Sequence, residues 1–74
     1  MQTRSARYVA FLRRLRKARE TANLTQADVA RKIGKPQSYV SKSESGERRV
    51  DVIELAAFAK IYRVPVHFFL DDEA

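Results

Sequence analysis

Apolar residues recur at every third or fourth position through the first third of the chain, which is the period of one face of an α-helix. Most positions between them are arginine or lysine. The pattern predicts an amphipathic helix over residues 5–22. In a chain of 74 residues without cysteine, further helices rather than disulfides must cover its apolar face. The series consists of Tyr8, Phe11, Leu12, Leu15, Ala18 and Ala22.

Capping residues predict four shorter helices after the first. Thr25 and Asp51 each have an acid three positions later, which is the spacing of a capping box. Gly34 and Gly46 provide stops, and Pro36 suits the first turn of the helix between them. The expected fold class is therefore all-α, a compact five-helix bundle in a single domain over residues 1–74. The four additional helices are expected over residues 26–33, 37–45, 52–62 and 66–70.

Composition excludes several classes of protein. Without cysteine there are no thiolate metal sites, and the single His67 cannot form a multi-histidine site, so we expect no metal and no cofactor. No acid pair, nucleophile–base set or phosphate loop is spaced for catalysis, so we do not expect an enzyme. No apolar run approaches the ~20 residues of a membrane-spanning helix, and the N-terminus lacks a signal peptide's apolar core. We expect a cytoplasmic protein.

The positive charge is concentrated in the first half of the sequence. The formal net charge is +6, but residues 1–35 hold ten basic and two acidic side chains. Residues 36–74 hold five basic and seven acidic ones. Such a distribution favours one face for a polyanion, either nucleic acid or an anionic membrane surface. The alternative is that arginine and lysine only solvate a helix.

The outer face of the predicted helix 37–45 is polar and nearly uncharged. Glutamine and serine are poor choices for helix stability, but they present donors and acceptors that match base edges in the major groove. The alternative is that Gln37 and Ser38 only cap the helix and that Ser41 is neutral surface. The face comprises Gln37, Ser38, Ser41, Lys42 and Ser45.

Four motifs in this order resemble the helix-turn-helix family of phage repressor and Cro proteins, the XRE family. They are Leu15–Arg19, Leu24–Ala30, Gln37–Lys42 and Glu44–Arg48, and the resemblance covers roughly residues 8–70. It implies a lambda-repressor-like bundle that binds double-stranded DNA.

The resemblance also implies a role for individual residues. Arg19 and Glu44 match a largely buried salt bridge between the first and third helices. Tyr39 matches a position near the DNA backbone, although packing against the second helix is an equal alternative. The implied base-reading residues are Gln37, Ser38, Ser41 and Lys42, and the implied phosphate contacts are Thr25, Gln26, Lys35, Tyr39, Arg48 and Arg49.

Two positions depart from the family pattern. Ser43 stands where members usually place a large apolar residue, so either the core is thinner there or Tyr39 or Tyr62 fills the space. Arg63 stands where many members have a helix-ending glycine, and a left-handed arginine would carry about 1 kcal/mol of strain.

The apolar C-terminal segment has more surface than a short helix can bury. We expect Phe68 in the core, and Val66, Phe69 and Leu70 at a two-fold interface; the alternative puts all of them in the core. The predicted function is a homodimeric, sequence-specific transcriptional repressor that reads a pseudo-palindromic operator. The sequence shows no evident small-molecule effector site.

Three alternatives to a dedicated repressor remain open. One is an antitoxin-type protein-binding module that autoregulates its operon, and another is a restriction–modification controller protein. The third is a basic amphipathic helix on an anionic membrane. Arg31 and Lys32 lean towards repression, since activating members often carry acidic residues on the second helix.

Overall fold

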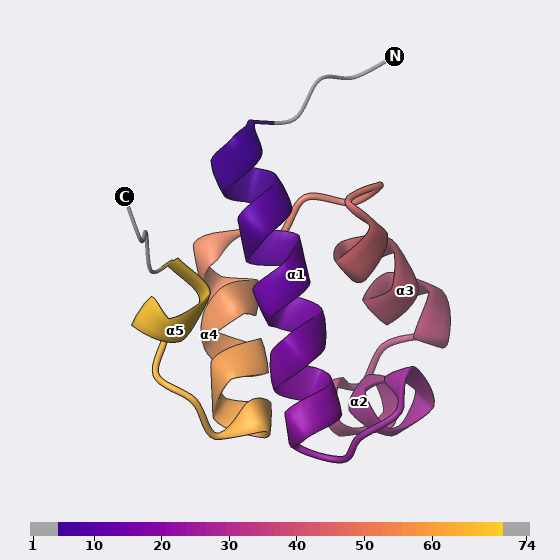
Figure 1. Cartoon of the computed structure of the whole chain (residues 1–74). Helices are drawn as coiled ribbons and strands as arrows, with labels where there is room; N and C mark the ends of the chain where they lie inside the picture. Colours follow the sequence, from indigo (N-terminus) through magenta and orange to yellow (C-terminus); the bar gives the residue numbers. More distant parts are fainter. Residues whose placement is uncertain (1–4, 71–74) are drawn as a thin grey trace.

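The computed structural model describes residues 5–70, and these residues form five helices (Figure 1). This part of the chain contains no strand, so the predicted all-α fold is confirmed. The elements are α1 (Ala6–Thr21), α2 (Gln26–Ile33), α3 (Gln37–Ser45), α4 (Val52–Tyr62) and α5 (His67–Leu70).

The helix limits follow the capping residues closely. The expected bounds of α2, α3 and α4 agree with the structure. The first helix is one residue shorter at each end than expected, because Ser5 is its N-cap and Ala22 its C-cap. The last helix begins at His67, one residue later than expected. Pro36, expected in the first turn of α3, is instead its N-cap, with an extended ψ of 156°.

Within residues 5–70, two non-glycine residues adopt the left-handed conformation where helices end. Asn23 has a φ of 62° just beyond α1, and Arg63 has a φ of 60° as the C-cap of α4. Asparagine tolerates this region better than most residues. Arg63 has no such advantage, so the position carries about 1 kcal/mol of strain.

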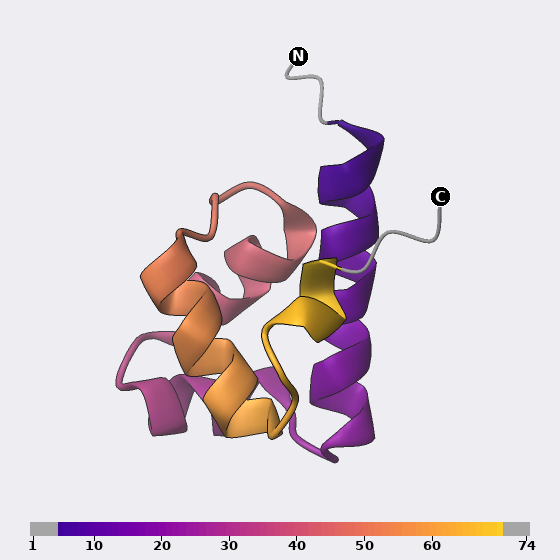
Figure 2. The ribbon, with the colours of Figure 1, turned by 90° about the vertical axis from the view of Figure 1, so that its left-hand side faces the viewer.

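The long helix α1 lies along one face of the molecule, with the other helices packed behind it (Figure 2). In Figure 1, α2 and α3 lie on one side of it and α4 and α5 on the other. The turned view in Figure 2 shows α5 lying against α1, in agreement with the contacts between these two helices. The core forms where the inner faces of all five helices meet. Its buried residues are Phe11, Leu15, Ala18, Val29, Ala30, Val40, Leu55, Phe58, Ala59, Tyr62 and Phe69.

Aromatic rings from α3 and α4 stack against one another between the two helices. The Phe58 ring lies between Tyr39 and Tyr62, with centroid distances of 6.3 and 5.9 Å. Ser43 is fully buried, and its hydroxyl donates to the Tyr39 carbonyl oxygen at 2.7 Å, so it leaves no unpaired polar group. Among residues 5–70, Tyr62 Oη is a buried side-chain atom without a hydrogen-bond partner.

The expected arrangement of the two C-terminal phenylalanines is wrong. Phe69, expected at a dimer interface, is 1% exposed, and its ring meets Phe11 edge-on at a centroid distance of 6.2 Å. Phe68, expected in the core, is only partly buried. Arg14 Nη1 donates to the Phe68 carbonyl oxygen at 3.3 Å and so joins α1 to α5 at this turn. A four-residue helix is too short for apolar spacing to fix which ring faces inward.

Candidate nucleic-acid interface

A tight turn joins α2 to α3 and sets the direction of the second helix. Thr25 begins α2 with a capping box: its hydroxyl accepts from the Asp28 amide at 3.0 Å, and its own amide donates to Asp28 Oδ2 at 2.8 Å. α2 ends at Gly34, whose φ of 75° is a conformation that glycine adopts without steric cost. The extended Pro36 then starts α3. The two helices form a helix-turn-helix unit (Figure 1).

The outer face of α3 is open and polar. Gln37, Ser38 and Lys42 are exposed, and within residues 5–70 their side chains make no hydrogen bond. Ser41 is partly buried and donates to the Ser38 carbonyl oxygen at a long 3.4 Å. Val40 and Ser43 occupy the opposite, buried face. The four side chains implied as base-reading therefore lie together on one face of one helix.

The start of α3 also leaves backbone donors open. Thr25 and Asp51 cap α2 and α4 with their side chains, whereas Pro36 makes no side-chain bond to α3. In the described chain, the amides of Gln37 and Ser38 have no hydrogen-bond acceptor. Amides at a helix start suit anionic groups, because they combine free N–H donors with the positive end of the helix dipole.

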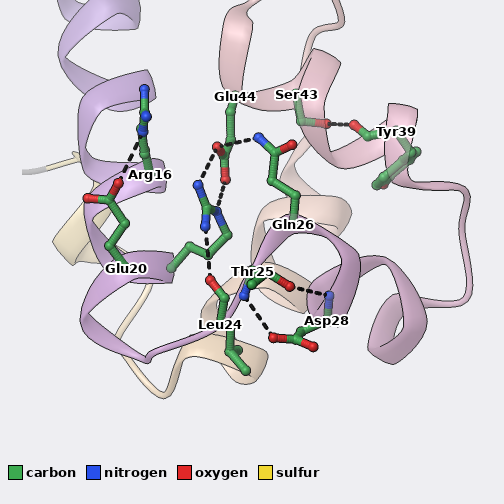
Figure 3. A network of polar contacts seen from close by, with 10 residues as sticks. Arg16, Glu20, Leu24, Thr25, Gln26, Asp28, Tyr39, Ser43 and Glu44 are labelled. Atoms are coloured by element: carbon green, nitrogen blue, oxygen red, sulfur yellow. Dashed lines mark hydrogen bonds and ion pairs between the residues drawn. The ribbon is translucent and has the colours of Figure 1, made fainter.

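A buried polar cluster ties α3 to α1 and α2 (Figure 3). Arg19 Nε donates to Glu44 Oε2 at 2.6 Å and Nη2 to Oε1 at 3.2 Å, which is a bidentate pair. The two side chains are only 11% and 6% exposed. The hydrogen bond to Glu44 raises the pKa of Arg19 further above its ordinary value. The pair expected between the first and third helices is thus present in the structure.

Two more contacts extend this cluster into the loop and into α2. Arg19 Nη1 donates to the Leu24 carbonyl oxygen at 2.9 Å, and Gln26 Nε2 donates to Glu44 Oε1 at 3.0 Å (Figure 3). The family resemblance implies a phosphate contact for Gln26. In the structure its amide nitrogen supports Glu44 instead, near the other end of α3. One of its two N–H donors is thereby engaged.

A second cluster lies behind the far end of α3 and centres on Arg48. Its guanidinium covers the Tyr39 ring, with Cζ 4.0 Å from the centroid. It also forms a two-point ion pair with Glu54, through Nη2 to Oε2 and through Nη1 to Oε1 at 3.2 Å. The hydrogen bond from Arg48 is the main cause that lowers the pKa of Glu54 to about 2. Arg48 therefore holds the loop after α3 against α4.

The sequence did not predict this cluster around Arg48. Arg48 was expected along a phosphate strand, and the sequence assigns Glu54 only to a capping box. Glu54 takes part both in the ion pair with Arg48 and in the capping box, because its carboxylate also accepts from the Asp51 amide at 2.9 Å. The two residues are six positions apart across a loop, a spacing that no helical or strand period connects. Periodicity and capping patterns therefore do not pair Arg48 with Glu54.

The other expected phosphate contacts occupy different environments. Tyr39 is partly buried, and burial is the main cause that raises its pKa, so its hydroxyl remains a proton donor. Arg49 is exposed, and its Cζ lies 4.6 Å from the Tyr8 ring centroid. Lys35 is exposed beside Tyr39, with Nζ 5.6 Å from that ring centroid. Lys35, which precedes α3 in the chain, and Arg49, which follows it, therefore keep their charges exposed to solvent.

Other classes of site receive no support in the described chain. Within residues 5–70, no three His, Cys, Asp or Glu side chains are grouped to hold a metal ion. None of the helices there combines the length and the apolar composition needed to cross a bilayer.

Two comparisons bear on this geometry. A family model described as Helix-turn-helix matches residues 15–69, most of the chain and all of the α2–turn–α3 unit. A comparison with curated proteins finds no match.

Proposed function

The chain belongs to the XRE and Cro type of helix-turn-helix DNA-binding regulators, and on that premise we propose that it is a homodimeric repressor reading a pseudo-palindromic operator. Repression by such a protein needs only occupancy of DNA near a promoter. Arg31 and Lys32, both exposed on α2, support repression because they provide no acidic surface for contact with a polymerase. The protein would act in the cytoplasm, where its DNA lies.

The open polar face of α3 is the observation that carries this proposal. A major groove admits one α-helix, and residues near its N-terminus reach the base edges. Gln37 can bond adenine through two atoms, and serine hydroxyls can serve several bases. Gln37 and Ser38 have no competing side-chain partner in residues 5–70. Ser41 and Lys42 would extend the contact along the groove.

Phosphate contacts would hold this helix in register. Exposed Lys35 and Arg49 precede and follow α3, so they suit the two backbone strands that border a groove. The open amides at the start of α3 can donate to a phosphate oxygen, and Thr25 and Gln26 at the start of α2 would add further phosphate contacts. Arg48 and Tyr39 would contribute mainly by fixing the loop that carries Arg49.

A dimer would place two recognition helices about 34 Å apart, one turn of DNA. Val66 and Leu70 supply exposed apolar surface for pairing, at 42% and 51% exposure.

Selection of bound sequences from random double-stranded DNA tests the proposal. We expect a motif with two inverted half-sites whose centres are about 10 base pairs apart. Binding upstream of a reporter should then reduce its transcription in vitro. Failure to enrich any motif would contradict sequence reading by α3, whereas a single unrepeated half-site would contradict the dimer. A higher affinity for anionic vesicles than for the selected DNA would favour the membrane alternative.

A further inference from the structure

An apolar groove lies between the start of α1, the start of α4 and α5. Its volume is about 530 Å³, within the roughly 300–1,000 Å³ of ordinary small-molecule sites. The lining comes from three separate stretches, 5–11, 49–55 and 69–70, so no motif marks the groove in the sequence. Its floor consists of core residues whose outer surfaces remain accessible, among them Phe11, Leu55 and Phe69.

The rim of this groove carries more positive than negative charge. Among the described residues that line it, Arg7 and Arg49 are cationic and Asp51 is anionic. The Asp51 carboxylate already accepts from the Glu54 amide at 2.8 Å as the cap of α4. Arg49 is exposed, and its guanidinium lies over the Tyr8 ring at the edge of the groove. The rim therefore favours an occupant with an anionic group beside an apolar body.

The Tyr8 hydroxyl adds a neutral donor at the same edge. Its Oη accepts from the Val50 amide at 3.2 Å, and both residues line the groove. A phenol can donate as well as accept, and within residues 5–70 the Tyr8 O–H has no acceptor. Arg49 and Tyr8 can therefore donate together to one anionic group.

We propose that the groove binds a small amphipathic carboxylate, a molecule with an alkyl or aryl body and one carboxylate group. The body would lie on Phe11, Leu55 and Phe69, and the carboxylate would accept from Arg49 and Tyr8. The planar fork of an arginine matches the two oxygens of a carboxylate, and such charged hydrogen bonds are stronger than neutral ones. A DNA phosphate would meet the rim but would leave the apolar floor uncovered.

Such a ligand would act on DNA binding through Arg49. The ligand carboxylate and the proposed phosphate contact need the same guanidinium, so each would weaken the other. This regulatory step rests on the proposed function, whereas the binding site itself does not. The ligand would make release from DNA depend on the concentration of a small molecule.

Isothermal titration of the full chain without DNA tests the site. Sodium octanoate is the probe, and octylammonium chloride is the matched probe with the same body and the opposite charge. We expect one octanoate per chain, bound at least about tenfold more tightly than octylammonium, which is the value of one hydrogen bond between charged groups. Arg49→Gln should remove most of this preference and keep the fold, because position 49 is exposed.

Three results of this titration would overturn the inference. Octanoate could fail to bind, or it could bind no more tightly than octylammonium. Octanoate that binds only when the chain is diluted would assign the groove to a second copy of the chain.

Ala10→Phe fills the groove, and Val9→Phe is its matched control. Ala10 lines the groove, whereas the adjacent Val9 is exposed outside it. The first substitution should abolish octanoate binding and the second should leave it unchanged, while circular dichroism melting shows whether both variants fold. Equal effects of the two would place octanoate elsewhere. Should Ala10→Phe fail to fold, the loss of charge preference in Arg49→Gln still decides.

A second titration tests the regulatory step with selected operator DNA. Saturating octanoate should weaken operator binding by about fivefold, the lower end of ordinary couplings between two sites, and DNA should weaken octanoate binding by the same factor. Octanoate binding without any effect on operator affinity would contradict competition for Arg49. A failure of α3 to select a DNA motif would leave the DNA-free titration unaffected, so the two failures are distinguishable.

Discussion

Gln37 begins α3 with an exposed side chain that no other described side chain engages. We predict that Gln37→Ala lowers affinity for selected operator DNA by about 1–3 kcal/mol, the value of a lost base contact, with little effect on random DNA. Competition binding with both DNAs measures the two losses. Thr21→Ala, an exposed position at the end of α1, is the control and should change neither affinity. Equal losses on both DNAs would contradict base reading by Gln37.

The Tyr62 hydroxyl is buried without a partner among the described residues. Burial raises the pKa of this phenol well above its ordinary value, with the nearby Glu44 charge adding to the shift. We predict that Tyr62→Phe increases the free energy of unfolding by about 1 kcal/mol, because it removes an unsatisfied polar group and keeps the ring stack with Phe58. Urea denaturation measures the change. A loss of stability would instead reveal a bonding partner for the hydroxyl.

The three helices α1, α2 and α3 share one buried carboxylate. Glu44→Gln leaves Arg19 buried with its charge unmatched, so we predict a loss of about 3–5 kcal/mol in the free energy of unfolding. The paired change Arg19→Met with Glu44→Leu should cost less than either single change, because no unpaired charge remains. Chemical denaturation of the unmodified chain, of Arg19→Met, of Glu44→Leu and of the double variant completes this double-mutant cycle. Additive losses would show that the pair contributes no coupling.

The connection between the α3–α4 loop and α4 depends on pH through Glu54. Its folded-state pKa of about 2 lies below the ordinary 4.5, so the ion pair with Arg48 stabilises the fold above pH 4.5. This contribution disappears as the pH falls towards 2. We predict that Glu54→Gln costs about 1–2 kcal/mol at pH 7, a range that allows for partial solvent exposure, and almost nothing at pH 2. Glu47→Gln, an exposed residue of the same loop, should show no such convergence.

Helix limits were largely predictable because they depend on neighbours in the sequence. The Thr25 and Asp51 capping boxes and the stops at Gly34 and Gly46 form with the residues expected. Side-chain pairs between elements were predictable only where the family resemblance supplied them, as for Arg19 and Glu44. The Arg48–Glu54 pair depends on the path of a loop, which periodicity does not describe. The inward direction of Phe69 depends on the orientation of a four-residue helix, which is too short for periodicity to predict.

At the scale of the whole molecule, the count of 15 lysine and arginine residues overstates the number of cations available to DNA. Arg19 and Arg48 are paired with Glu44 and Glu54, and Arg16 with Glu20 at 3.2 Å. We predict that Arg49→Ala lowers the slope of log affinity against log salt by about 0.9, the value for one released counterion. Arg48→Ala should change the slope less and the stability more. Titrations at several salt concentrations measure both slopes, and identical slopes would contradict the distinction.

The cluster of Arg19, Gln26 and Glu44 also has a thermodynamic consequence. Both oxygens of Glu44 are engaged from α1 and α2, so α3 cannot turn about its own axis without breaking a bond. The face of α3 that we propose reads bases is therefore oriented before DNA binds, and association would order few additional backbone torsions. The heat-capacity change of DNA binding should then correspond to rigid docking of two preformed surfaces, without the excess that accompanies folding on a template.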